Sequence, residues 1–159
     1  MDTPVKKGKV IAELPKKNEI PIFSNVFPMK MLTARDSIMK YFRPILHKYK
    51  FTEQQWRVLR TLQQGKQGTL KLAKDCSIMP SSVSRLTQGL IKRGLIIRMS
   101  SSNLNDLRQV QFMLTEKGEG KINEIAPHIQ SAYKEIQKKA GEDNVREMLR
   151  LLDIVIDAL

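Results

Sequence analysis

Apolar residues recur at helical spacing over several stretches of the chain, and glycines, prolines and short polar runs separate these stretches. Over residues 31–49 the apolar positions gather within about 140° of a helical wheel, which predicts an amphipathic helix. Thr52 and Gln55 have the spacing of a capping box, so the next helix is expected from there to about Gln63. Glycines at 65 and 68 interrupt the pattern, and a short helix is expected over residues 70–75.

The middle of the chain changes from helical spacing to short apolar runs. Pro80 suits the first position of a helix that continues through Arg93, and Gly94 suits its C-cap. Residues 95–98 and 110–114 are predicted strands, joined by a polar loop. The order helix, strand, polar tip, strand is that of a winged helix-turn-helix, which predicts duplex DNA as the partner.

Two helices are expected after the strands, over residues 115–140 and 142–159, with Gly141 between them. The last is apolar over more than half its circumference, because Leu151 and Ile154 fall outside its main stripe. Such a helix either lies in a core or binds a second copy, and we favour a homodimer because a two-fold reader gains specificity.

The expected fold class is therefore mainly α with a small antiparallel β wing, a winged helix-turn-helix plus a helical dimerisation region. Residues 1–30 form an N-terminal arm whose apolar second half should pack, most simply on the dimer partner. Residues 31–51 and 115–159 form the dimerisation region, and residues 52–114 form the DNA-binding domain.

Charge supports a polyanionic partner. The chain of 159 residues has a net charge of +12, and residues 57–110 alone hold ten Lys and Arg against two acidic residues. Residues 111–159 are slightly acidic, with seven basic against nine acidic side chains. The basic excess thus coincides with the predicted DNA-binding domain.

Other function classes find little support. No apolar run is long enough to span a bilayer and no secretory signal is evident, so a cytoplasmic protein without a membrane partner is expected. Cys76 is the one cysteine, which excludes an intrachain disulfide and a multi-cysteine metal cluster. The chain has two histidines. With no Gly-rich phosphate loop or nucleophile elbow, we expect no catalytic residue, metal or cofactor.

The helix predicted from Pro80 through Arg93, called the reader helix below, carries candidate DNA contacts in its first turns. Arg85 can form a forked pair with guanine in the major groove, and Gln88 could reach adenine. Short hydroxyls close by can approach bases or phosphates, although serines are also common at helix N-termini. The predicted contacts of this helix are Ser81, Ser82, Ser84, Arg85 and Gln88.

The wing carries the other candidates. Arg108, near the tip, suits the narrow minor groove, and Asp106 has the wrong charge for DNA and is expected to hold Arg108 or Arg98 in position. Arg98 is included among the predicted contacts. The alternative for Asp106 and Arg108 is a solvated turn pair.

Arg35 lies in the middle of the apolar face of the first predicted helix. A buried guanidinium is costly unless paired, and its partner could be a protein carboxylate, a helix C-terminus or a ligand carboxylate. Asp36 is adjacent but points about 100° away, which makes it an awkward partner.

Three elements with fixed spacing then identify a resemblance: Gly-Leu-Ile-x-Arg at residues 94–98, Asp-x-Arg at 106–108, and Leu-Thr-x-x-Gly at 114–118. From about Met31 to the C-terminus the chain resembles the MarR-type transcriptional regulators. Residues 34–36, 41–45 and 52–58 are more narrowly similar to the homoprotocatechuate-operon repressor branch. Gln109, where a further basic residue is common, and Met79, where a capping side chain is common, depart from the pattern.

The resemblance implies a homodimeric repressor of an aromatic-acid catabolic operon that a phenolic acid releases from a palindromic operator. It also implies that Arg35 contacts the ligand carboxylate, with Met39, Phe42 and Trp56 as pocket walls and His128 as a phenol contact. A structural salt bridge at Arg35, a winged-helix DNA binder without small-molecule control, and a redox switch at Cys76 remain alternatives.

Overall fold

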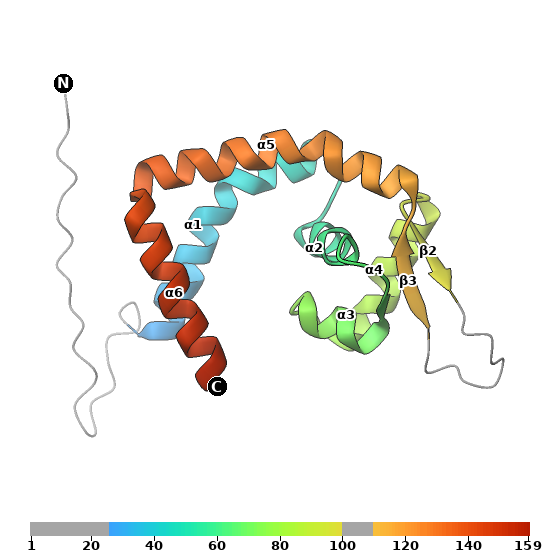
Figure 1. Ribbon diagram of the computed structural model, residues 1–159, viewed down its shortest axis with the longest axis horizontal. Coiled ribbons are helices and arrows are strands. Elements are labelled where there is room, and N and C mark those ends of the chain that lie inside the picture. Colours follow the sequence, from blue (N-terminus) through green and yellow to red (C-terminus); the bar gives the residue numbers. More distant parts are fainter. Residues whose placement is uncertain (1–25, 100–109) are drawn as a thin grey trace. The chain divides into compact units, whose positions relative to one another are not determined.

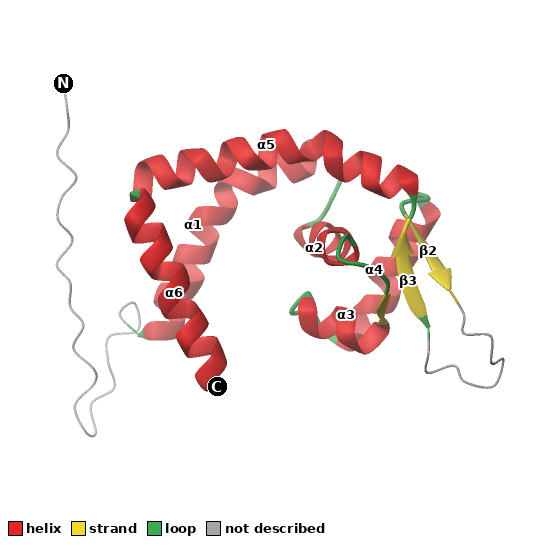
Figure 2. Cartoon of the chain, viewed as in Figure 1, coloured by secondary structure: helices red, strands yellow, loops and turns green. Residues whose placement is uncertain are grey.

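The computed structural model describes residues 26–99 and 110–159 of the chain. These residues form six helices and a three-stranded sheet (Figure 1, Figure 2). The chain divides after Ser37 into two units, which are described separately. The helices are α1 (Phe27–Lys48), α2 (Glu53–Leu62), α3 (Thr69–Asp75), α4 (Pro80–Lys92), α5 (Glu116–Ala140) and α6 (Glu142–Ala158), and the strands are β1 (Gln67–Gly68), β2 (Ile96–Met99) and β3 (Gln111–Leu114).

The first unit is described from residue 26 and holds the first half of α1. The helix begins at Phe27, four residues before its predicted start at about Met31. Pro28 lies in the first helical turn, where a missing N–H removes no hydrogen bond, and this explains how the helix includes it. Residues 1–25 of the predicted arm lie outside the described residues.

The second unit contains α2, which begins with the predicted capping box. The Thr52 hydroxyl accepts from the backbone N–H of Gln55 at 3.1 Å, and the Gln55 side chain accepts from the backbone N–H of Thr52 at 3.1 Å. Two N–H groups that no helical carbonyl could reach are thereby satisfied. The start of this helix was predicted to the residue.

The sheet is antiparallel with the order β1-β3-β2. The two predicted strands, β2 and β3, pair from Ile96 opposite Leu114 to Met99 opposite Gln111. On the other side of β3, Gln67 of β1 lies opposite Phe112. The sequence did not predict β1, because a strand of two residues shows no alternation of apolar and polar positions.

One apolar core joins helices α2, α3 and α4, the sheet and the start of α5. Every one of these elements contributes a side chain that is almost completely buried, and Leu46 and Phe51 add the end of α1. Trp56 is partly buried against this core. The fully buried leucines and isoleucines are Leu59, Leu72, Leu90, Leu95, Ile96, Ile122 and Ile125.

Cys76 also belongs to this core and is 2% exposed. Its Sγ lies 3.3 Å from the hydroxyl of Thr61. Burial raises the pKa of the Cys76 thiol, and the Thr61 hydrogen bond and nearby Arg57 oppose that rise only in part. Since the thiolate is the reactive form, this environment argues against a redox switch at Cys76.

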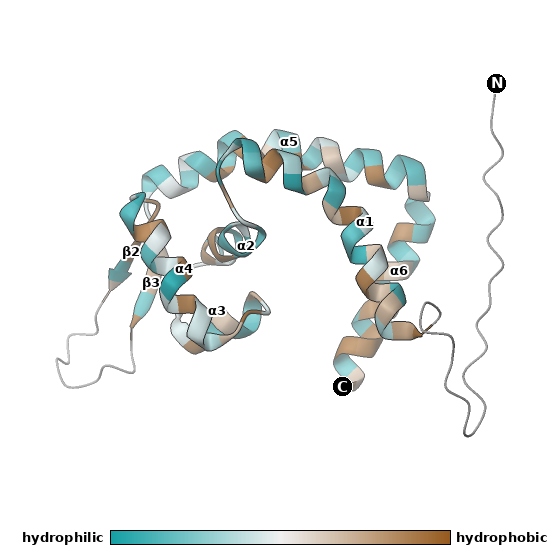
Figure 3. Ribbon diagram, turned by 180° about the vertical axis from the view of Figure 1, so that it is seen from behind, coloured by the Kyte–Doolittle hydropathy of each residue, from teal (hydrophilic) through white to brown (hydrophobic). Residues whose placement is uncertain are grey.

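Helix α6 has no buried residue along its fully described length. Its apolar side chains are nevertheless numerous, as the hydropathy colours of Figure 3 show. Leu149, Leu151, Ile154 and Ile156 are each exposed by roughly half or more. Of the two alternatives for the last helix, burial in a core is therefore not observed in the single chain.

Gly118, in the first turn of α5, lies very close to the backbone of Leu95. A Cβ atom at this position would stand 2.1 Å from the backbone carbonyl oxygen of Leu95. Thr115 forms the N-cap of the same turn, accepting from the N–H of Gly118 at 3.0 Å and donating to the Gly94 carbonyl at 2.8 Å. The Leu-Thr-x-x-Gly pattern thus specifies how α5 begins against the strand entry.

We expect Gly118→Ala to destabilise the fold by about 3 kcal/mol, because the backbone of Leu95 would have to move. Gly120→Ala is the matched control on the same helix. It places its methyl group in open space and should stabilise the protein by about 0.5–1 kcal/mol. Urea unfolding of both variants measures the difference, and equal stabilities would contradict the close approach.

Candidate nucleic-acid interface

Helix α4 divides its side chains between the core and solvent. Val83, Thr87 and Leu90 are buried, whereas Leu86 and Ile91 are partly exposed. The exposed face consists of four of the predicted contact residues: Ser81, Ser84, Arg85 and Gln88.

These four positions follow the spacing i, i+3, i+4, i+7, which places them on one face of the helix. The fifth predicted contact residue, Ser82, is partly buried beside them. The helix therefore offers two hydroxyls, one guanidinium and one amide to solvent along two turns.

The N-terminus of α4 has an unusual cap. Met79 occupies the N-cap position and its side chain forms no capping hydrogen bond, as the sequence predicts. Pro80 follows at the start of the helix, where its ring is tolerated. Because Met79 is 70% exposed, this end of the helix presents an apolar side chain to solvent ahead of the serines.

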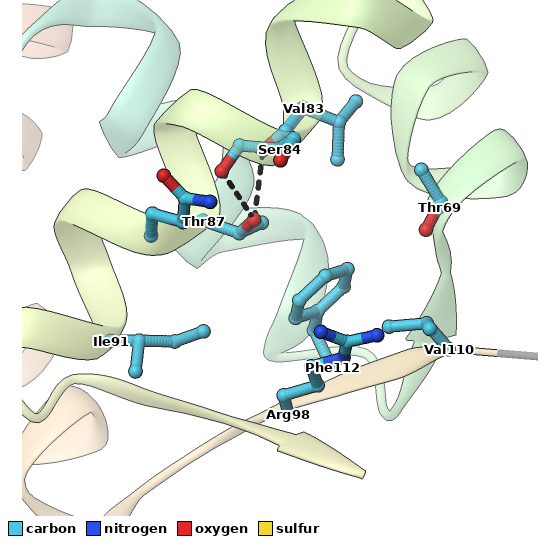
Figure 4. A pocket seen from close by; sticks show the side chains of 9 residues that line it. Thr69, Val83, Ser84, Thr87, Ile91, Arg98, Val110 and Phe112 are labelled. Atoms are coloured by element: carbon cyan, nitrogen blue, oxygen red, sulfur yellow. Dashed lines mark hydrogen bonds between the residues drawn. The ribbon is translucent and has the colours of Figure 1, made fainter. Parts of the chain in front are cut away.

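Arg98 belongs to the same surface. It lies on β2 opposite Phe112 of β3, and both side chains line a hollow between the sheet and α4 (Figure 4). Ser84 and Gln88 line the hollow from the helix. The structure thus brings Arg98 together with two of the predicted contacts of α4.

Two threonines near this hollow were not predicted. Thr87 is 2% exposed, and its hydroxyl donates to the backbone carbonyls of Val83 at 2.8 Å and Ser84 at 3.1 Å (Figure 4). Thr69, at the start of α3, lines the hollow from the opposite side. Thr87 lies three residues after Ser84, and this spacing could have indicated that it lies near the predicted DNA contacts. A threonine inside a helix, however, does not usually indicate a functional contact.

The predicted wing-tip residues, Asp106 and Arg108, lie outside the described residues. The strands that lead to the tip are described on both sides, ending at Met99 and resuming at Val110. Their contact roles stay predictions.

Arg35 differs from its prediction. Its side chain is 49% exposed in the chain, so the guanidinium is not buried. It lies 3.4 Å from the carboxylate of Asp36, the residue expected to be an awkward partner. The error arose because an apolar helical face was assumed to be covered, and in this first unit Met31 and Leu32 are exposed as well.

The other predicted ligand residues lie in the second unit, in separate contacts. Phe42 is buried with its ring 4.9 Å from that of Tyr133. The rings of Trp56 and Phe51 lie 6.4 Å apart, and exposed His128 lies 5.9 Å from the ring of Tyr49.

Met39 is partly exposed on α1, one turn before Phe42. Tyr41, Tyr49 and Tyr133 were not among the predicted ligand residues. Tyr133 is far from the other two in the sequence, so residue spacing did not indicate that they lie near the predicted residues.

Two classes of site are absent from the parts of the chain that the structure describes. No group of three or more metal-binding side chains occurs there. Nor is any helix among these residues both long and apolar enough to cross a bilayer.

Comparison with known proteins identifies the family. The model of the family described as transcriptional regulator SarA/Rot matches residues 40–125. The regulator FarR of Neisseria gonorrhoeae is 35% identical over 130 residues, which cover 80% of this chain and 84% of FarR. The homoprotocatechuate degradative operon repressor of Escherichia coli is 32% identical over 125 residues, 77% of this chain and 82% of the repressor.

A solved structure agrees with these relatives. The crystal structure of NadR in complex with 4-hydroxyphenylacetate superposes with a TM-score of 0.70 at 30% identity, covering 91% of this chain and 97% of NadR. All of these proteins are regulators and not enzymes. With the α4 helix that begins at Pro80, the two wing strands and the Leu-Thr-x-x-Gly turn in place, the chain belongs to the MarR-type winged-helix transcriptional regulators.

Proposed function

We propose that the protein is a homodimeric repressor of an aromatic-acid catabolic operon and that a phenolic acid releases it from a palindromic operator. The observation that carries the DNA-binding part is the polar face of α4. Ser81, Ser84, Arg85 and Gln88 are exposed on one side of a helix whose other side is buried in the core. Arg98 extends that face onto the sheet.

In this proposal α4 enters the major groove. Arg85 is long enough to form a forked pair with guanine, and Gln88, on the same face, suits adenine. Arg98 and the wing approach the flanking backbone, and Arg108 reaches the minor groove with Asp106 holding its position. Ser81, Ser82 and Ser84 make the shorter contacts with bases or phosphates.

We expect Arg85→Ala to lower the affinity for a duplex selected by the wild-type protein by about 10- to 100-fold and to relax the choice of one base pair. Arg146→Ala, which removes the same side chain from α6, is the matched control and should leave affinity unchanged. Fluorescence anisotropy at fixed salt measures both. Equal losses for the two variants would show a general charge effect in place of base recognition.

The dimer proposal is supported by α6. Leu149 and Ile156 are seven residues apart on one face of the helix and are 55% and 69% exposed. A surface of this kind on a regulated DNA-binding protein is typical of an interface with a second copy. Two copies would present two α4 helices to half-sites about one DNA turn apart.

Ile156→Asp should therefore shift the protein from dimer to monomer, because a charge would be buried in the interface. Ile156→Leu keeps the apolar surface and should remain dimeric. Light scattering after size-exclusion chromatography distinguishes the two states. A monomeric wild-type protein, or a dimeric Ile156→Asp, would refute the role of this face.

The ligand proposal is supported by the relatives and by Arg35. The E. coli relative is named for an operon that degrades an aromatic acid, and NadR was solved with 4-hydroxyphenylacetate. Arg35 is a cation that follows the exposed Met31 and Leu32 by one turn of the helix, and about half of its side chain is accessible. A guanidinium next to apolar side chains suits the carboxylate of an aromatic acid.

In the same proposal Met39, Phe42 and Trp56 contact the ring of the ligand and His128 contacts its phenol. The competing function is a winged-helix DNA binder without small-molecule control. The pairing of Arg35 with Asp36 supports this alternative, because it gives Arg35 a carboxylate partner within the protein. A thermal-shift series with phenolic acids separates the two, because only a ligand-controlled protein gains stability from binding.

For Arg35→Ala we expect unchanged operator binding and at least about tenfold weaker release by 4-hydroxyphenylacetate or a related acid. Lys30→Ala, an exposed cation on the same helix, is the control and should respond as the wild type does. The measurement is operator anisotropy during titration with the acid. A normal response of Arg35→Ala would assign the arginine to structure alone.

A further inference from the structure

Arg93 joins three elements of the second unit at one point. It is the C-cap residue of α4, directly after the helix that carries the proposed base contacts. Its side chain leaves α4 and reaches the end of α1, where its two terminal nitrogens donate to the backbone carbonyls of Lys50 at 2.9 Å and Tyr49 at 3.3 Å.

The backbone N–H groups of Lys50 and Phe51 close the end of α1 by donating to the carbonyls of His47 and Leu46, each at 2.9 Å, and Arg93 adds a donor for the Tyr49 and Lys50 carbonyls that follow. The last carbonyls of a helix have no N–H within the helix, and they form the negative end of its dipole. Lys50 adopts φ 58, so the chain turns sharply there before Phe51 enters the core. A cation that holds both carbonyls stabilises this turn.

The contact requires an arginine. The guanidinium carbon lies 4.0 Å from the centre of the Phe51 ring while its nitrogens reach the two carbonyls. Only a planar fork can stack on a ring and donate in two directions at once. Burial lowers the pKa of Arg93, so the group is held partly away from water.

The backbone of Arg93 is held from the other side. Lys117, in the first turn of α5, donates from Nζ to the Arg93 carbonyl at 2.8 Å. The next residue, Gly94, has φ 69, and its carbonyl accepts from Thr115 at 2.8 Å. The end of α4 is therefore fixed to both α1 and α5.

This anchoring determines where the far end of α4 lies. The helix has 13 residues and is about 20 Å long, so a tilt of about 5° at Arg93 would move the first turn by about 2 Å. Hydrogen bonds to base edges tolerate only about 0.5 Å. Loss of the contacts at Arg93 would therefore weaken the proposed DNA contacts of Ser81 and Arg85, although neither residue is altered.

We infer that Arg93 is a positioning residue for DNA recognition, which fixes the reader helix against the end of α1 and makes no contact with DNA itself. The inference rests on the proposed function. It also gives α1 a direct mechanical connection to α4, since the residue that caps one helix is the residue that ends the other.

The test compares Arg93→Lys, Arg93→Ala and the control Lys92→Ala, whose exposed cation lies at the same helix end. Each is titrated with a duplex selected from a random pool by the wild-type protein, with a scrambled duplex of equal length, and at several salt concentrations. Circular dichroism melting defines temperatures at which each variant is folded.

We expect Arg93→Lys to bind the selected duplex at least about tenfold more weakly, because lysine keeps the charge but loses the fork. Affinity for the scrambled duplex and the salt slope should stay as in the wild type, since no phosphate contact is lost. Lys92→Ala should keep its preference for the selected duplex.

Three results would overturn the inference. Full affinity of Arg93→Lys for the selected duplex would show that the fork is dispensable. A salt slope reduced by about 0.9 would make Arg93 a phosphate contact. Equal weakening on both duplexes, in proportion to the unfolded fraction, would leave a role in stability only, and Arg93→Lys decides the matter if Arg93→Ala does not fold.

Failure of the proposed function has a different outcome. A wild-type protein that enriches no sequence from the random pool would refute sequence-specific repression, and this inference with it. A wild-type protein that enriches a duplex, with Arg93→Lys binding it equally well, refutes the inference alone.

Discussion

The close approach of α5 to the entry of β2 organises the second unit. Gly118 leaves no side chain between the first turn of α5 and the Leu95 carbonyl, and Thr115 caps the helix while it bonds the neighbouring Gly94. The start of α5, the entry of β2 and the end of α4 are joined by this close approach and by hydrogen bonds from the Thr115 and Lys117 side chains. These contacts fix the arrangement of α4 and the sheet relative to α5. The family's Leu-Thr-x-x-Gly pattern is thus explained by packing and helix capping, without a role in binding.

The surface that we propose for DNA contact follows from that arrangement. Val83, Thr87 and Leu90 fix the rotation of α4 about its axis, and that rotation turns Arg85 and Gln88 to solvent, with Gln88 lining the same hollow as Arg98. Selectivity therefore depends on buried residues as much as on those that would touch bases. Thr87 illustrates this, since its hydroxyl is bonded within the helix and its methyl group packs inward.

Local signals predicted the fold well where a few neighbouring residues decide the structure. The Thr52 capping box, Pro80 at a helix start and Gly94 after a helix end are of this kind. Prediction was wrong where distant partners decide. β1 exists because β3 lies beside it, and Arg35 was expected to be buried although its side chain is 49% exposed. Likewise the pairing of Arg93 with the end of α1 joins residues 43 apart and could not be read from spacing.

The burial of Cys76 has a consequence for how copies of the protein associate. It is the only thiol in the chain, it lies inside the core, and its pKa is raised by that burial. No covalent crosslink can therefore hold two folded copies together, and any pairing through α6 is reversible and follows mass action. Occupancy of a two-fold operator would then rise with roughly the square of the free monomer concentration at low abundance. The cellular amount of the protein would itself be a control variable, independent of any small molecule.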